Sequence, residues 1–180
     1  GKELSVFQDE EQTEAIKIMA NAECSSQKDQ GIAKLVDGKE ETVYHSTWGD
    51  DSGPTLEDGE EFEGKKITEI VRPETTTKSS ELIKNNKIYI LLPKEENVAR
   101  LVYTSRQKEK DGRITGVNIY VSKKEKLTYS EVENWTKVSE ETVNWADSEE
   151  DQVFDFKPEQ EGVRWICLEV KHSAGSEEDK

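Results

Sequence analysis

The sequence predicts an all-β protein, an antiparallel β-sandwich of the jelly-roll type, formed by a single domain that spans residues 1–180. Three observations predict it. Short segments of alternating or continuous hydrophobicity recur along the chain, Asp-Gly and proline turn signals separate them, and no convincing amphipathic helix interrupts them. With 32% hydrophobic and 36% charged residues, the core must be compact and long polar loops must lie outside it.

Nine segments have the composition of β-strands. They are Leu4–Phe7, Ile16–Cys24, Lys66–Val71, Lys87–Leu92, Val98–Ser105, Gly116–Ser122, Trp135–Glu140, Gln152–Phe156 and Val163–Val170. Within the sixth, Val117, Ile119 and Val121 occupy alternate positions, so they share one face of the strand. Residues 163–168 are apolar almost throughout, which predicts a strand covered on both faces.

The connections between these segments are polar. Turn chemistry marks Asp37-Gly38, Asp58-Gly59, Asp111-Gly112 and Pro158. Asp9–Ala15 and Thr128–Asn134 could each form a short helical turn. We interpret residues 49–86 as an inserted hairpin or loop, because they lack the apolar mass for a core of their own. Residues 174–180 are small and charged, which predicts a flexible tail.

The formal net charge is −15, from 40 acidic and 25 basic residues. Such a surface repels phosphate backbones and anionic membranes, so neither nucleic acid nor a membrane is an expected partner. The sequence contains no stretch of 18 apolar residues that could span a bilayer. There is no GxSxG motif and no glycine-rich phosphate loop, and 40 carboxylates make coincidental acid pairs inevitable. We therefore expect no enzymatic activity.

Two cysteines, Cys24 and Cys167, lie far apart in the sequence. Neither belongs to a CxxC or Cys/His pattern, so zinc is not indicated. They could form one disulfide or remain two buried thiols, because the sequence does not supply the geometry that a bridge requires.

The order of several motifs is similar to that of a known family. Residues 19–26, an Ala- and Ser-containing strand, precede residues 35–48, which contain Asp-Gly, a threonine and then His-Ser. This order resembles the opening of discoidin, or coagulation factor 5/8 type C, domains. Later landmarks follow in the family's order, at Leu101–Gln107, Asp111–Ile114 with Val117–Ser122, Trp135–Val138 and Val163–Leu168. The resemblance covers residues 16–172, with 49–86 as an extra segment.

Within this galactose-binding-like superfamily, the sequence most resembles carbohydrate-binding modules of family 32. The resemblance implies a non-catalytic module for galactose- or N-acetylgalactosamine-type glycans, secreted or on a cell surface and attached to a glycoside hydrolase. It places His45 and Arg106 where they contact an axial hydroxyl. Asp111 stands where the family often has asparagine, and it can accept but not donate a hydrogen bond. Trp48 is the first candidate for an aromatic platform, and Trp145 is a second.

The resemblance also implies a structural calcium ion, bound by carboxylate and carbonyl oxygens. The loop supplies the Asp37 carboxylate, the Thr42 hydroxyl and the backbone carbonyls of Leu35, Lys39 and Thr42. In the family, a glutamate from the last strand completes the site. Residues 2–7 resemble that strand, so we hypothesise that the N-terminal segment takes its place and that Glu3 is the ligand. The alternatives are Glu169, a strand missing from this chain, or an Asp-Gly turn without metal.

Two other functions remain open on the same fold. Discoidin domains also serve as protein-binding or adhesion modules, and such a sandwich can be a structural spacer without a ligand. The fold does not decide among these functions, because binding depends on the loops.

Overall fold

A computed structural model of the chain shows a β-sandwich. It describes residues 1–22, 30–39, 41–45, 87–125 and 135–175, and the backbone of 71–72 and 127–128. The elements, in chain order, are β1 (Glu3–Phe7), β2 (Met19–Ala22), the 3-10 helix η1 (Ile32–Leu35), β3 (Val71–Arg72), β4 (Lys87–Thr104), β5 (Ile114–Ser122), β6 (Leu127–Thr128), β7 (Thr136–Lys137), β8 (Val143–Asn144) and β9 (Gln152–Ser173). The first prediction, an all-β sandwich, is confirmed.

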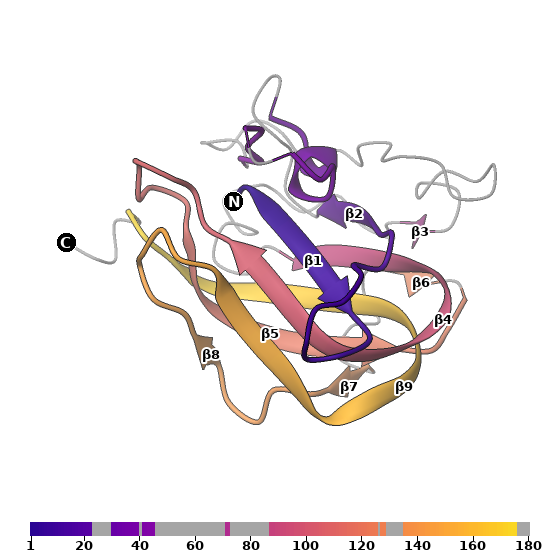
Figure 1. The fold of residues 1–180 in the computed structure, drawn as a ribbon. Coiled ribbons are helices and arrows are strands. Elements are labelled where there is room, and N and C mark those ends of the chain that lie inside the picture. The colour runs from indigo at the N-terminus through magenta and orange to yellow at the C-terminus, as the bar shows by residue number, and fades with distance from the viewer. Residues whose placement is uncertain are drawn as a thin grey trace.

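Two long curved strands, β4 and β9, belong to both layers of the sandwich (Figure 1). The C-terminal half of β4 pairs with β1 and with the start of β9, whereas its N-terminal half pairs with β2 and with the later part of β9. Register shifts between Leu91 and Arg100 separate the two halves. Such irregularities bend a strand and let it pass from one sheet to another. The second layer continues through β5, which pairs with β7 and β8.

The core lies between the two layers and follows the predicted periodicity. Val117, Ile119 and Val121 of β5 all belong to the core, with exposed fractions of 4% or less. Leu4 and Val6 of β1 face the same core from the other layer. Burial of each such side chain contributes about 1.5–3 kcal/mol.

The second layer is also covered on its other face. Trp165 and Cys167 are fully buried, and in the register of the sheet they lie beside Leu91 and Tyr89 of β4. The ring of Trp135 meets that of Tyr89 edge-on at a centroid distance of 6.0 Å. The prediction that residues 163–168 are buried on both faces is therefore confirmed. Cys24 lies outside the described residues, so the predicted alternatives for the two cysteines stay open.

Several predicted boundaries are wrong. Segments 87–92 and 98–105 form one strand, β4, and segments 152–156 and 163–170 form one strand, β9. Pro158 therefore lies inside a strand instead of at a turn, and Pro93 does too. Each proline falls in a stretch where the pairing of β4 and β9 is irregular, so the missing N–H removes no ladder hydrogen bond.

Other elements also differ in length or type. β2 begins at Met19 and not at the predicted Ile16, and residues 23–24 lie outside the described residues. β7 is shorter than the predicted segment 135–140, and β6 and β8 were not predicted. The β3–β6 pair is parallel; most of the predicted strand 66–71 and of the insertion 49–86 lies outside the described residues. Residues 9–15 form a turn closed by Gln12 N–H donating to the Asp9 carbonyl at 3.3 Å, not a helical turn.

The predicted tail begins too early. Ala174 is 6% exposed, its N–H donates to the Arg113 carbonyl, and its carbonyl accepts from the Gly112 N–H, both at 2.9 Å. These two backbone bonds attach the end of β9 to the loop before β5. The rest of the predicted tail, 176–180, lies outside the described residues.

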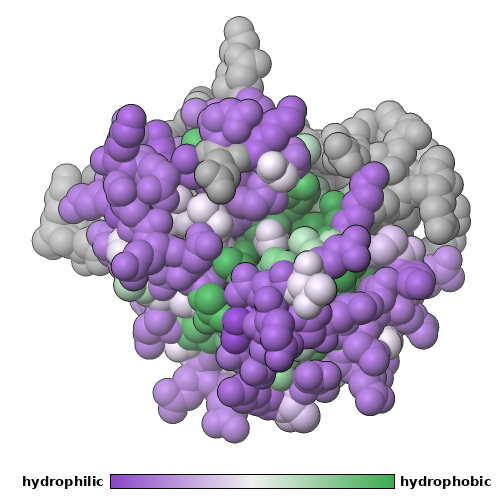
Figure 2. All heavy atoms as spheres, viewed as in Figure 1, coloured by the Kyte–Doolittle hydropathy of each residue, from purple (hydrophilic) through white to green (hydrophobic). Residues whose placement is uncertain are grey.

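The surface agrees with the composition. Figure 2 shows a predominantly hydrophilic face on which hydrophobic atoms occupy small areas between polar side chains. Val153, at 42% exposure, is the one large hydrophobic side chain that is exposed among the described residues. Within that part of the chain, no helix has the length and apolar character needed to cross a bilayer.

Candidate functional site

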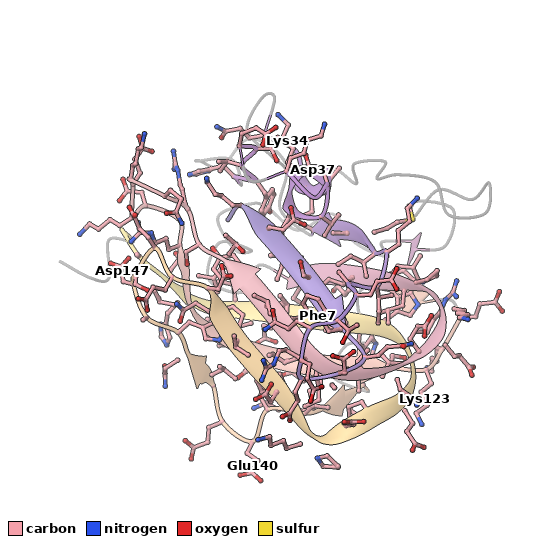
Figure 3. All side chains as sticks on the ribbon, viewed as in Figure 1. Phe7, Lys34, Asp37, Lys123, Glu140 and Asp147 are labelled. Carbon is pink, nitrogen blue, oxygen red and sulfur yellow. The ribbon has the colours of Figure 1, made fainter. Side chains whose placement is uncertain are left out.

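Four polar segments meet at the end of the sandwich where β1 begins and β4 ends. They are residues 34–39 with 41–45, 105–113, 145–150 and 173–175. Backbone hydrogen bonds attach two of them to each other and one to the N-terminus: Gly112 N–H donates to the Ala174 carbonyl, and Tyr44 N–H donates to the Gly1 carbonyl. Lys34 and Asp37 lie near the start of β1, far from Lys123 and Glu140 (Figure 3).

His45 and Arg106 both lie against one turn, Asp111-Gly112. A methyl group added at Gly112, whose φ of +78° lies in the left-handed region, would lie 3.5 Å from Nε2 of His45, so the imidazole lies against this glycine. Arg106 Nη1 donates to the Asp111 carbonyl at 3.3 Å, and its Nη2 forms an ion pair with Glu109. The structure thus places the His45 and Arg106 side chains against the same turn, which contains Asp111.

The Arg106 and Asp111 side chains differ in accessibility. The Arg106 side chain is 20% exposed. A guanidinium has five N–H donors, and the two described contacts leave others for a ligand. The Asp111 carboxylate is exposed at the end of the sandwich, and a methyl group at Gly175 would overlap its Oδ1. The site therefore offers guanidinium donors, an imidazole and a carboxylate acceptor over a short stretch of surface.

The aromatic part of the site is only partly described. Trp48 lies outside the described residues. The prediction of Trp145 as a second platform is wrong. Trp145 is 7% exposed, and its ring stacks on that of Tyr103 with a centroid distance of 5.2 Å and an interplanar angle of 11°. Although its sequence neighbours Asn144 and Ala146 are exposed, the indole between them points into the core. A polar local sequence thus conceals a buried side chain.

A cluster of oxygen atoms surrounds the Thr42 hydroxyl beside this site. Its Oγ1 lies 3.0 Å from both carboxylate oxygens of Asp37 and 2.9 Å from the Lys39 carbonyl. The Lys34 carbonyl is 3.3 Å away. One hydroxyl proton can serve only one acceptor well, so most of these are oxygen–oxygen contacts without a proton between them.

Glu3 adds a second carboxylate to this cluster. Its Oε2 accepts from the Gly38 N–H at 3.1 Å. Burial and the neighbouring Asp37 carboxylate raise the pKa of Glu3 to about 7, although backbone N–H groups oppose the shift. Two nearby carboxylates, a hydroxyl and carbonyls are donors that calcium accepts in irregular geometry. The described residues contain no group of three or more His, Cys, Asp or Glu side chains suited to a metal, so a metal here would need carbonyl ligands.

Four of the predicted oxygen donors lie in this cluster or beside it, namely Asp37, Thr42, Lys39 and Glu3. The Lys34 carbonyl was missed, and it approaches Thr42 because η1 ends in this loop; the predicted Leu35 follows it as the last residue of η1. Glu169, the alternative glutamate, pairs in register with Lys87 and Asn118 and accepts from Lys171 Nζ at 2.9 Å.

The position of Glu3 follows from strand pairing. Residues 3–7 form β1, which pairs antiparallel with β4 so that Glu3 lies opposite Thr104. The N-terminal segment thus occupies an edge position in the first layer, as the hypothesis of a substituted last strand requires. Its side chains alternate, and Glu3 projects away from the core that Leu4 faces.

The raised pKa of Glu3 predicts a pH dependence of the metal-free protein. The folded state binds a proton with a pKa of about 7, against 4.5 in the unfolded chain, so ionisation costs stability as pH rises from about 4.5 to 7. In EDTA, the wild type should therefore lose about 1 kcal/mol of unfolding free energy relative to the Glu3→Gln variant as pH rises over this interval. The loss is smaller than the full pKa shift would give, because the Glu3 carboxyl is half-exposed and solvent screens its interactions. Urea denaturation at several pH values measures the difference. A constant difference between the two proteins would contradict it.

The β-sandwich fold of this chain is shared with carbohydrate-binding modules of known structure. Two solved structures from Clostridium perfringens are similar. The module CpGH89CBM32-5, in complex with GalNAc-β-1,3-galactose, has 19% identity and a TM-score of 0.56, and the alignment covers 88% of this chain and 87% of that one. The family 32 carbohydrate-binding module of NanJ, in complex with galactose, has 14% identity and a TM-score of 0.59, with 96% and 90% covered. No protein-family model and no curated protein sequence matches the chain.

Proposed function

We propose that the chain is a non-catalytic carbohydrate-binding module for galactose- or N-acetylgalactosamine-type glycans. The observation that carries the proposal is that His45 and Arg106 both lie against the Asp111-Gly112 turn, at the loop end of the sandwich. Its support from outside the chain is the likeness to two modules solved with galactose-containing sugars.

Each residue has a physical role in this proposal. A sugar is recognised by directional hydrogen bonds to its hydroxyls and by an apolar face against its ring C–H groups. Arg106 donates to an axial hydroxyl, and His45 bonds to the same group or its neighbour. Asp111 accepts a hydrogen bond from an adjacent hydroxyl. An asparagine in its place could both accept from that hydroxyl and donate to it. Trp48, three residues after His45, provides the apolar face.

The same proposal includes a structural calcium ion. The Asp37 and Glu3 carboxylates, the Thr42 hydroxyl and the carbonyls of Lys34 and Lys39 would hold it. The ion would neutralise two adjacent carboxylates and fix a loop whose last described residue is His45. Calcium thus stabilises the fold and orders one side of the sugar site.

The acidic, predominantly hydrophilic surface and the loop-end site suit a module that holds a larger secreted or surface glycoside hydrolase on its glycan. In that setting the module contributes affinity for the polymer, and the linked enzyme contributes the chemistry. Its affinity should be modest, with a Kd on the order of 10⁻⁴ M, since a shallow sugar site desolvates little surface.

Calorimetric titration with galactose, N-acetylgalactosamine and lactose, with and without EDTA, tests the proposal. We expect binding of at least one of these sugars, with glucose, which has an equatorial 4-hydroxyl, as the matched control that binds more weakly. Absence of binding to all of them by the calcium-loaded chain would contradict the proposal. It would favour a protein-binding module or a spacer on the same fold.

A further inference from the structure

Arg106 stands at the start of a tight turn, which continues through residues 107–109. Glu109 N–H donates to the Gln107 carbonyl at 2.8 Å. Lys108 between them has a φ of +66°, a left-handed conformation that costs a non-glycine residue about 1 kcal/mol or more. Such a turn persists only if its surroundings hold it.

Glu149, from the segment before β9, makes the bonds that hold this turn. Its Oε1 accepts from the Lys108 N–H at 2.7 Å, and its backbone carbonyl accepts from Gln107 Nε2 at 2.8 Å. Hydrogen bonds to an ionised carboxylate are among the stronger ones in proteins. The bond to Lys108 satisfies a backbone N–H of the strained residue itself.

Arg113, which follows the Asp111-Gly112 turn, contacts the backbone of Arg106. It is 6% exposed, and its Nε donates to the Arg106 carbonyl at 2.8 Å. Its Nη1 pairs with Asp147 at 3.0 Å and its Nη2 faces Glu149 at 3.7 Å. A buried guanidinium needs such carboxylate partners. The same Glu149 oxygen therefore contacts both the Lys108 N–H and the neighbourhood of Arg113.

From these contacts we infer that Glu149 and Arg113 are positioning residues for the sugar site, holding the backbone of the Arg106 turn so that the guanidinium meets the ligand. The inference rests on the proposed function and adds to it a role for residues that touch no sugar. Nothing in the local sequence around Arg106 encodes this support, because Glu149 comes from a distant segment of the chain.

Substitution of Glu149 tests the inference. Glu149→Ala removes the carboxylate acceptor of Lys108, so the affinity for galactose should fall about tenfold. Glu149→Gln keeps an acceptor oxygen but loses the charge that faces Arg113, so a fall of about threefold is expected. Glu150→Ala is the matched control, because Glu150 is the adjacent exposed glutamate and its described contact is through its backbone carbonyl. It should bind like the wild type.

A double-mutant cycle with Arg106→Ala separates positioning from a general structural effect. If Glu149 acts through Arg106, Glu149→Ala should cause no further loss of affinity in the Arg106→Ala background. NMR titration with galactose measures dissociation constants in the millimolar range that these variants require. An equal tenfold loss in both backgrounds, or wild-type affinity of Glu149→Ala, would overturn the inference.

The Arg106 Nε–H NMR signal supplies a readout that does not depend on sugar. In the Glu149→Ala variant it should shift or broaden as the side chain samples more orientations, whereas Glu150→Ala should leave it unchanged. If the wild type binds none of the sugars, the proposed function fails, but this signal still decides whether Glu149 orders Arg106. An Arg106 signal identical in all variants would refute the positioning role.

Discussion

Replacement of Arg106 with alanine is expected to lower the affinity for galactose by about 30-fold, into the millimolar range. A hydrogen bond from a charged donor contributes about 1.5–3 kcal/mol, and each 1.4 kcal/mol corresponds to a factor of ten in Kd. His45→Ala should cause a loss of similar size or somewhat less. Isothermal titration calorimetry, supplemented by NMR for the weakest variants, provides the measurement.

Arg100→Ala is the matched control for this experiment. Arg100 belongs to β4, the strand that ends at Thr104 just before Arg106. Its side chain is 19% exposed against 20% for Arg106, and it too pairs with a carboxylate, Asp155, at 2.6 Å. Because it lies away from the loop end, its removal should leave galactose binding unchanged. If Arg100→Ala weakened binding as much as Arg106→Ala, the loss would reflect general charge or stability and not contact with the sugar.

Calcium is expected to raise the thermal unfolding midpoint of the wild type by about 5–10 °C. At a calcium concentration of about 100 times Kd, binding to the folded state alone adds about 2.7 kcal/mol. In a domain of this size each kcal/mol shifts the midpoint by about 2–4 °C. Differential scanning calorimetry in calcium and in EDTA measures the shift, which EDTA should reverse.

The Asp37→Asn variant should lose most of this response, because one of the two carboxylates that balance the charge of the ion is gone. Asp9→Asn is a suitable control, since Asp9 also accepts hydrogen bonds from a nearby threonine, Thr13, but has no described contact with the oxygen cluster. An unchanged midpoint in calcium, or an equal response of wild type and Asp37→Asn, would show that the oxygen cluster holds no such ion.

The strand predictions are confirmed where the pattern of apolar residues was clear. In β5 the alternation of Val117, Ile119 and Val121 with other residues specified which face is buried, and the continuous apolar run in 163–168 specified burial on both faces. Pro158 misled the prediction, because the usual meaning of proline as a strand breaker does not hold where two curved strands pair irregularly. That irregularity is a property of the pairing and is not visible in either segment alone.

Some features of the candidate site could be predicted from nearby residues in the sequence, and others could not. The loop sequence from Asp37 to His45 sufficed to predict that Asp37, Thr42 and Lys39 lie together, because these residues are close along the chain. Trp145 was mistaken for a possible platform, because its polar neighbours gave no sign that Tyr103, from another strand, stacks on it. The support of Arg106 by Glu149 had no sequence signal at all.

The amino-acid sequence by itself determined the β-sandwich class, the alternation of the core strands and the oxygen-rich loop, since each depends on residues that are near neighbours in the chain. Tertiary structure alone decided that β4 and β9 each serve both layers, that Glu3 lies beside Asp37, and that Glu149 and Arg113 hold the Arg106 turn. The physical reason is that hydrogen bonds and burial depend on distance in space, and the curvature of two long strands brings these distant segments together.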